Sequence, residues 1–217
     1  MRVADRDALK TQFDSPLADA SRQFGGFPFR QKRRVVLHST HHNRPPLQIT
    51  AYLADDAATE ALGAELAKYL APGLVIYLRG DLGAGKTALA RAMLRALGYQ
   101  GKVKSPTYTL VEFYVISRLN LYHFDFYRFN DPYEWLDAGF REYFNPASVC
   151  LVEWPEKAEG LLPPADIVIA LRIQDCGRAA DITAETKTGR RCLSKWRQRR
   201  NASPVSGGES MAEREDG

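Results

Sequence analysis

The segment GDLGAGKT, residues 80–87, decides the fold expected for this chain. An apolar run at residues 74–78 leads into it as a short buried strand, and residues 88–97 follow it as a helix that Gly98 ends. Strand, glycine-rich loop and helix in this order are the setting of a phosphate-binding loop. The glycines let backbone N–H groups turn toward phosphate oxygens, and the helix N-terminus adds its positive end. The segment therefore predicts binding of a nucleoside triphosphate.

The last residues of this loop have distinct expected roles. Lys86 is expected to reach the β and γ phosphates, and the Thr87 hydroxyl is expected to hold a magnesium ion. A GTPase-like switch would also need an Asn/Thr-Lys-x-Asp motif to read guanine, and TKTG at residues 186–189 lacks the Asp. This argues against a guanine nucleotide. The other residues expected to line the phosphates are Leu82, Gly83, Ala84 and Gly85.

Two acidic residues follow apolar runs and are candidates for the metal side of the reaction. Glu153 ends the run that begins at Val149, and Asp125 follows the run that begins at Leu121. Nucleotide hydrolases place a carboxylate at the end of a strand beside the phosphate loop, where it meets Mg²⁺ directly or through water. Either acid could instead be an ordinary surface residue at a strand end. The sequence does not decide which of them holds metal, orients water or senses the γ phosphate.

Trp154 follows Glu153 directly, and successive strand residues point to opposite faces. Pro155 is expected to end the strand, which frees the indole either to turn toward a base or to pack in the core. His123 stands within the neighbouring apolar run. We expect it to be a packed histidine rather than a general base.

Composition limits the class of protein. The chain has 217 residues, of which 45% are hydrophobic, and this suffices for one α/β domain with a sizeable core. The net charge of +4 arises largely outside the expected core and is weak evidence for nucleic-acid binding. Cys150, Cys176 and Cys192 lie far apart, which favours a reducing compartment over a disulfide framework or zinc site. With no apolar stretch of membrane-spanning length and no signal-peptide pattern, we expect a cytoplasmic protein without a membrane partner.

Changes in composition divide the chain into three expected parts. Residues 1–46 are expected to be a disordered basic leader, residues 47–190 a P-loop ATPase domain, and residues 191–217 a disordered tail. In the leader, a cluster of His38, His41 and His42 lacks the companions of a metal site, and the basic run at residues 30–34 is expected to be solvated.

Within the domain, the pattern predicts an α/β class, a P-loop NTPase-like three-layer fold with a mostly parallel central sheet. Helices are expected near residues 55–70 and from Asp131 onward. Strands other than the one before the loop are expected near residues 48–53 at a sheet edge, 108–115, 121–127, 149–152 in the centre, 166–173 and 178–183.

Four further segments follow the loop in a fixed order. They are KSPTYTLVEFY at residues 104–114, LYHFDFYRFNDPYEW at 121–135, GFREYF at 139–144 and CLVEWPEKAEGLLP at 150–163. Together with the loop, they make the chain resemble the TsaE family, also called YjeE, over about residues 47–183. Five ordered segments are far more specific than the phosphate loop alone.

The resemblance implies roles for individual residues. Lys86 and Thr87 would serve phosphate and magnesium, Glu153 would act as the Walker B carboxylate on the metal, and Asp125 would lie in a switch-like segment near the γ phosphate. The expected catalytic residues are therefore Lys86, Asp125 and Glu153, with Thr87 and Glu153 on the metal. Thr59, Trp154 and Arg178 complete the expected nucleotide contacts, those of Thr59 and Arg178 resting on shorter motifs.

The resemblance also implies a biological role, which periodicity and spacing do not show. ATP hydrolysis with Mg²⁺ would support a complex of the proteins TsaB and TsaD, which forms threonylcarbamoyladenosine on tRNA. The chain would meet tRNA only indirectly, through that complex. The alternative is a small-molecule kinase, against which Arg118, Arg128 and Arg141 argue because they are scattered rather than gathered in one lid.

Overall fold

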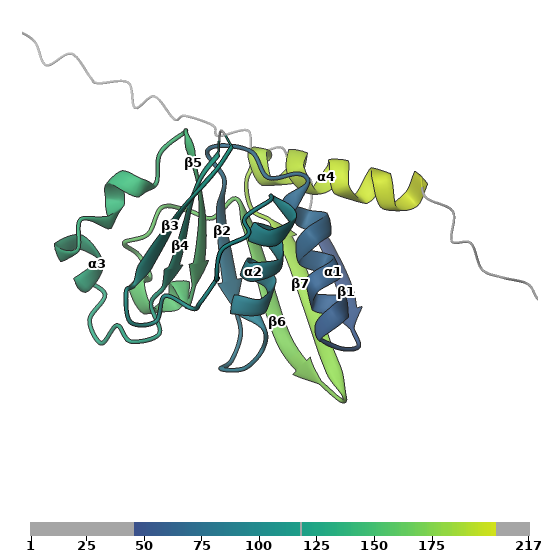
Figure 1. Ribbon diagram of the computed structural model, residues 1–217, viewed down its shortest axis with the longest axis horizontal. Coiled ribbons are helices and arrows are strands. Elements are labelled where there is room, and N and C mark those ends of the chain that lie inside the picture. Colours follow the sequence, from purple (N-terminus) through teal and green to yellow (C-terminus); the bar gives the residue numbers. More distant parts are fainter. Residues whose placement is uncertain (1–45, 118, 203–217) are drawn as a thin grey trace, which may run out of the picture. The chain divides into compact units, whose positions relative to one another are not determined.

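The computed structural model describes residues 46–117 and 119–202, and a seven-stranded sheet forms the centre of this part (Figure 1). The expected leader up to residue 45, with its three histidines and its basic run, lies outside the described residues, as do Arg118 and residues 203–217. The strand order across the sheet is β1-β7-β6-β2-β5-β4-β3. The strands are β1 (Leu47–Leu53), β2 (Val75–Arg79), β3 (Val111–Ile116), β4 (Leu119–Asp125), β5 (Ser148–Glu153), β6 (Ile167–Gln174) and β7 (Gly177–Ala184).

The sheet is mixed, with a parallel centre. Strands β6, β2, β5 and β4 run parallel to one another, whereas β1, β7 and β3 join through antiparallel pairs. Only Asp175 and Cys176 separate β6 from β7, and a connection this short can join only antiparallel strands, as it also does between β3 and β4. The expected α/β class is confirmed, and the parallel pairs are confined to the four strands around the loop.

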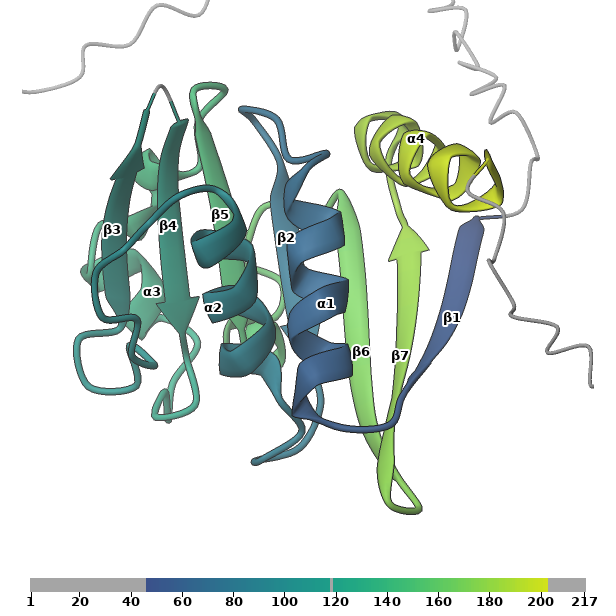
Figure 2. The same cartoon turned by 45° about the vertical axis from the view of Figure 1, so that its right-hand side comes forward.

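Helices α1 (Asp56–Ala67) and α2 (Lys86–Ala96) cover one face of the sheet and lie side by side (Figure 2). Asp55 caps α1, because its side chain accepts a hydrogen bond of 2.7 Å from the Ala58 N–H. The helices touch at Gly63, where a Cβ atom would lie 2.7 Å from the Ala92 Cβ. Only glycine allows this approach, so α1 is packed directly against the helix that follows the loop.

The opposite face carries short helical turns and an aromatic core. These turns are α3 (Glu134–Asp137), η1 (Phe140–Tyr143) and η2 (Pro155–Ala158). The helix expected from Asp131 is thus shortened to α3. The buried aromatic side chains of this face are Phe124, Phe126, Phe129, Trp135 and Phe140. With α1 and α2 on one face and these turns on the other, the sheet is the middle of three layers.

Residues 191–202, expected to belong to a disordered tail, form most of a helix, α4 (Lys187–Ala202). The expectation is corrected because Cys192, Leu193 and Trp196 make an apolar stripe at helical spacing that is buried in the main core. The Cys192 thiol also donates to the Tyr69 carbonyl at 3.3 Å. The many basic residues of this segment hid the stripe in the sequence.

The cysteines and the apolar character of the helices also bear on expectations from the sequence. Cys150, Cys176 and Cys192 all lie in the described part and are unpaired. None of the helices in that part has the length and apolar character needed to cross a membrane.

Candidate nucleotide-binding site

The glycine-rich loop connects β2 to α2 at the carboxyl edge of the parallel strands, as expected from the sequence. Gly80 has φ 133°, and a Cβ atom there would lie 2.2 Å from the Leu171 carbonyl oxygen of β6, so only glycine fits. Gly85 has φ 104° and begins α2 without a side-chain cap. The first N–H groups of α2 are therefore available to an anion, and the helix dipole favours negative charge there.

The other loop residues differ in what they can offer a ligand. The Leu82 side chain is 70% exposed, and Gly83 leaves open space. Ala84 is buried, and its N–H donates to the Asp81 carbonyl at 3.1 Å. Ala84, which the sequence predicts as a phosphate contact, therefore does not line the cavity at the loop.

Lys86 is folded into the loop. Its ammonium donates to the carbonyl oxygens of Gly80 (2.5 Å) and Asp81 (2.8 Å) and lies 3.9 Å from the centre of the Trp154 ring. Burial lowers the pKa of Lys86, while the nearby carboxylates, Glu153 first among them, oppose this shift. A phosphate in the loop would add negative charge beside the ammonium and favour its charged form.

Thr87 and Glu153 meet behind the loop. The Thr87 hydroxyl lies 2.9 Å and 3.0 Å from the two carboxylate oxygens of Glu153, which ends the buried strand β5. Hydroxyl and carboxylate oxygens are ligands that Mg²⁺ prefers, so this pair fits the ion expected here. No group of three or more His, Cys, Asp and Glu side chains able to hold a metal occurs in the described part. The remaining ligands would therefore be phosphate oxygens and water, as is usual for Mg²⁺.

His123 contacts the same carboxylate. Its Nε2 lies 2.8 Å from Glu153 Oε1, and both side chains are buried. His123 is packed, as the sequence suggested, but the contact with Glu153 was not foreseen. It follows from the register of β4 on β5, which pairs His123 with Leu151 and Asp125 with Glu153. Because side chains alternate along a strand, His123 lies on the same face of β4 as Asp125, and this spacing could have indicated that His123 faces the candidate acids.

Asp125 ends β4 beside Glu153 and is tied to the turn that precedes β3. Its carboxylate accepts hydrogen bonds from the hydroxyls of Ser105 and Thr107, each at 2.5 Å, and from the Tyr127 N–H at 3.0 Å. Residues 104–107 begin one of the segments that resemble the family, but nothing in the sequence pattern predicts a role for these two hydroxyls. The structure makes them partners of the candidate catalytic acid.

Trp154 lies where the strand has ended, as expected. Its backbone is left-handed (φ 57°, ψ 48°), and its ring contacts the Tyr127 ring at a centroid distance of 5.0 Å. The indole is half-buried against the cation of Lys86 at the edge of the site. It is therefore part of the site's wall.

Arg178 and Thr59 reach the site from two different elements. Arg178, on β7, donates to the Thr59 hydroxyl at 3.1 Å and pairs with Asp56 at 2.7 Å. The Arg178 side chain lies next to Gly85 and lines a cavity of about 400 Å³. Thr59 is buried, does not line this cavity, and contacts it only through Arg178. The other predicted residues lining this cavity are Leu82, Gly83, Gly85, Lys86, Thr87, Asp125, Glu153 and Trp154.

Comparison with known proteins identifies the family of this chain. The model of the family described as threonylcarbamoyl adenosine biosynthesis protein TsaE matches residues 53–180. A tRNA threonylcarbamoyladenosine biosynthesis protein TsaE of Haemophilus influenzae is 45% identical over 151 residues, covering 67% of this chain and 96% of that protein. The protein of the same name from Bacillus subtilis is 41% identical over 114 residues, covering 52% of this chain and 71% of its own length.

A solved structure is also similar. The crystal structure of Bacillus subtilis YdiB matches with a TM-score of 0.63 and 30% identity, covering 73% of this chain and 99% of that one. Since the family model spans more than half of the sequence and the Haemophilus relative matches over nearly its whole length, the chain belongs to the TsaE family of tRNA threonylcarbamoyladenosine biosynthesis proteins.

Proposed function

We propose that this protein binds and hydrolyses ATP with Mg²⁺, in support of threonylcarbamoyladenosine formation on tRNA. The observation that carries the proposal is the Thr87–Glu153 contact of 2.9 Å beside the phosphate loop. In this contact a hydroxyl and a carboxylate lie next to the first N–H groups of α2 and the ammonium of Lys86. This is the combination that a nucleotide's phosphates and their metal ion require.

Lys86 would bind the β and γ phosphates. Its ammonium is held by two neutral carbonyls, and a charged phosphate oxygen is the stronger acceptor, so the ammonium would turn to the nucleotide when it binds. Mg²⁺ would neutralise phosphate charge when bound, with Thr87 and Glu153 as its protein ligands. His123 would hold the Glu153 carboxylate in place through its 2.8 Å contact.

Asp125 would act on the side of the γ phosphate. Its carboxylate lines the cavity together with Ser105 and Thr107, which both donate to it. A carboxylate in this position can orient the water that attacks the γ phosphate. Because Asp125 also accepts hydrogen bonds from Ser105 and Thr107, loss of the γ phosphate would change the position of the turn at residues 104–107.

The walls of the cavity suit a nucleotide better than the lid of a small-molecule kinase. Trp154 offers an aromatic face at the rim, and Arg178 adds a cation beside Gly85. Arg128 and Arg141, which a kinase lid could have used, do not line this cavity. Arg128 instead lies over the Tyr108 ring at 4.1 Å.

The partners proposed are TsaB and TsaD, with tRNA met through their complex. This follows from the resemblance to the family, and its test is a pull-down from a bacterial lysate with and without ATP. Recovery of both proteins is the expected result. Failure to recover either one with ATP present would contradict the proposed partnership.

Replacing Lys86 tests the nucleotide site itself. Lys86→Ala removes the cation facing the phosphates, so we expect ATP binding to be lost. The variant also loses two hydrogen bonds to loop carbonyls, so its melting temperature without nucleotide is measured as well, to show that it is folded. Lys102→Ala, at an exposed position outside the cavity, is the matched control and should bind ATP normally. Tight ATP binding by the Lys86 variant, measured by equilibrium titration, would refute the assignment.

A further inference from the structure

Helix α4 carries a regular row of basic side chains on its solvent side. Lys187, Arg191, Lys195 and Arg199 recur at every fourth position and are all exposed; we call them the basic stripe. Each step of four residues advances about 6 Å along a helix, so the stripe extends over about 18 Å. Helix α4 contains no acidic residue, and none of the four takes part in an ion pair between described residues.

Such a row is unfavourable for the isolated helix, because like charges at i and i+4 repel each other. The helix is nevertheless anchored by Leu193 and Trp196, which are buried in the core. The fold thus holds a line of positive charge at fixed spacing on its surface. A ligand with regularly repeated negative charge is the natural complement.

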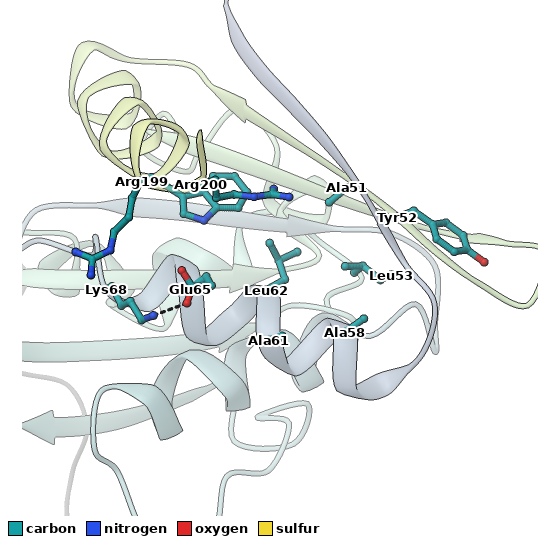
Figure 3. Close-up of a pocket in the computed structure, with 11 residues that line it drawn as sticks. Ala51, Tyr52, Leu53, Ala58, Ala61, Leu62, Glu65, Lys68, Arg199 and Arg200 are labelled. Atoms are coloured by element: carbon teal, nitrogen blue, oxygen red, sulfur yellow. Dashed lines mark hydrogen bonds and ion pairs between the residues drawn. The ribbon is translucent and has the colours of Figure 1, made fainter. Parts of the chain in front are cut away.

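A groove lies beside the stripe, between α4, α1 and β1. It has a volume of about 700 Å³, and Figure 3 shows Arg199 and Arg200 of α4 facing it across from Leu62 of α1 and Ala51 of β1. Arg200 lies over the Trp196 ring at 5.2 Å, so its guanidinium is held at the groove wall. Among the described residues, the only acid lining the groove is Glu65, which is already paired with Lys68. The groove is therefore apolar along its floor and positive at one end.

We propose that α4 and this groove bind an unpaired segment of RNA. The phosphates would lie along the basic stripe, and a base would enter the groove against its apolar floor and Arg200. Single-stranded RNA is bound in this way, by a basic track together with flat apolar, aromatic or guanidinium surfaces that receive bases. The choice of RNA among polyanions rests on the proposed function in tRNA modification. The inference goes beyond that function, because it adds a direct contact between this chain and RNA to the contact proposed through the partner complex.

A membrane surface suits this helix less well than RNA. A helix that lies in a lipid interface inserts an apolar face, and the apolar face of α4 is used within the protein, where Cys192, Leu193 and Trp196 are buried. An acidic peptide would pair with the basic stripe but would leave the apolar floor of the groove unused. Both remain outcomes that the experiment can reveal.

The test is fluorescence anisotropy of the full chain with a labelled 20-nucleotide oligouridylate and with a blunt RNA duplex of the same length. Arg191→Glu/Lys195→Glu should weaken binding of the single strand at least tenfold. Losing two phosphate contacts should also lower the slope of log affinity against log salt by about 1.4. The charge-conserving pair Arg191→Lys/Lys195→Arg should bind like the wild type.

The matched control is Lys102→Glu/Arg141→Glu, which makes the same change in net charge at exposed positions outside α4. Equal weakening by the control pair would overturn the proposal, because net charge and not α4 would then attract RNA. Equal binding of single strand and duplex would exclude the groove as a base site and also overturn it. Tighter, stripe-dependent binding of polyglutamate or of vesicles rich in anionic lipid would show that the occupant is wrong.

ATP binding is measured in the same variants. The stripe lies outside the nucleotide cavity, so ATP affinity should be unchanged by Arg191→Glu/Lys195→Glu. Absence of ATP binding in the wild type would refute the proposed function, whereas absence of RNA binding would refute only this inference. The two failures are thus distinguishable.

Discussion

Glu153 and Asp125 lie side by side at the ends of β5 and β4, yet their contacts differ. Glu153 faces the Thr87 hydroxyl, whereas Asp125 holds the Ser105 and Thr107 hydroxyls. We therefore expect Glu153→Gln to weaken the Mg²⁺ dependence of nucleotide binding. Asp125→Asn should keep ADP binding and lose hydrolysis. Titrations with and without Mg²⁺, together with phosphate release, measure both effects.

The control for this pair is Glu142→Gln, which neutralises an exposed acid outside the cavity and should change neither quantity. If Asp125→Asn altered the Mg²⁺ dependence and Glu153→Gln did not, the two roles would have to be exchanged.

Trp154 gives a spectroscopic readout of the site. Trp135 and Trp196 are buried, so a quencher dissolved in water reaches mainly the half-buried indole of Trp154. Saturating ATP should protect Trp154 from iodide quenching if the base stacks on it. Trp154→Leu should remove most of the quenching. It should also weaken ATP binding tenfold or less, since aromatic stacking contributes about 0.5–1.5 kcal/mol beyond area burial. Unchanged quenching and unchanged affinity would leave Trp154 with a packing role only.

For single residues, the sequence predicted those site residues that their own neighbours in the chain identify. Lys86 and Thr87 stand in one contiguous motif, and Glu153 and Asp125 each end an apolar run, so neighbours along the chain identify them. The contacts of His123 with Glu153 and of Ser105 with Asp125 join residues from different segments. These contacts depend on strand register and on the path of a turn, which single-residue patterns do not specify.

Among the elements, α4 is one whose sequence pattern did not predict its structure. Basic residues outnumber apolar ones in its sequence, and such a charged composition is typical of disordered segments. Three apolar side chains nevertheless pack the helix against the domain. Cys192, Leu193 and Trp196 are all buried in the main core. Elements with an uninterrupted pattern, such as α1 and β5, were predicted within a few residues at each end.

Shortening a buried apolar side chain of α4 tests whether the helix contributes to stability. Leu193 is fully buried, so Leu193→Ala should lower the free energy of unfolding by about 2–5 kcal/mol through lost contacts and the cavity left behind. Arg197→Ala, at an exposed position of the same helix, should stay within about 0.5 kcal/mol of the wild type. Urea denaturation measures both. Equal stability of the Leu193 variant and the wild type would show that α4 is not packed in solution.

Nucleotide binding should stabilise the molecule as a whole, because only the folded chain assembles the loop, Glu153 and Asp125 at one sheet edge. At an ATP concentration about 100 times its Kd, the folded state gains about 2.7 kcal/mol. For a domain of this size that raises the melting temperature by roughly 5–10 °C. Differential scanning fluorimetry should show this rise with Mg²⁺, a smaller one with EDTA, and none for Lys86→Ala. A rise of equal size in the Lys86 variant would place ATP elsewhere on the protein.

The pairing of β1 with β7 has a consequence for how the protein is made. These strands are neighbours at one sheet edge, with Leu53 opposite Arg178, although they lie near opposite ends of the described part (Figure 2). Strand β2, before the loop, likewise has β5 and β6 as its partners, and both are translated later. Roughly 120 residues separate β1 from β7, so at about 5–20 residues per second the first strand waits about 6–25 s on the ribosome for its partner. During that time the nascent chain exposes the unpaired β1 and β2, so the sheet can be completed only after β7 has been translated.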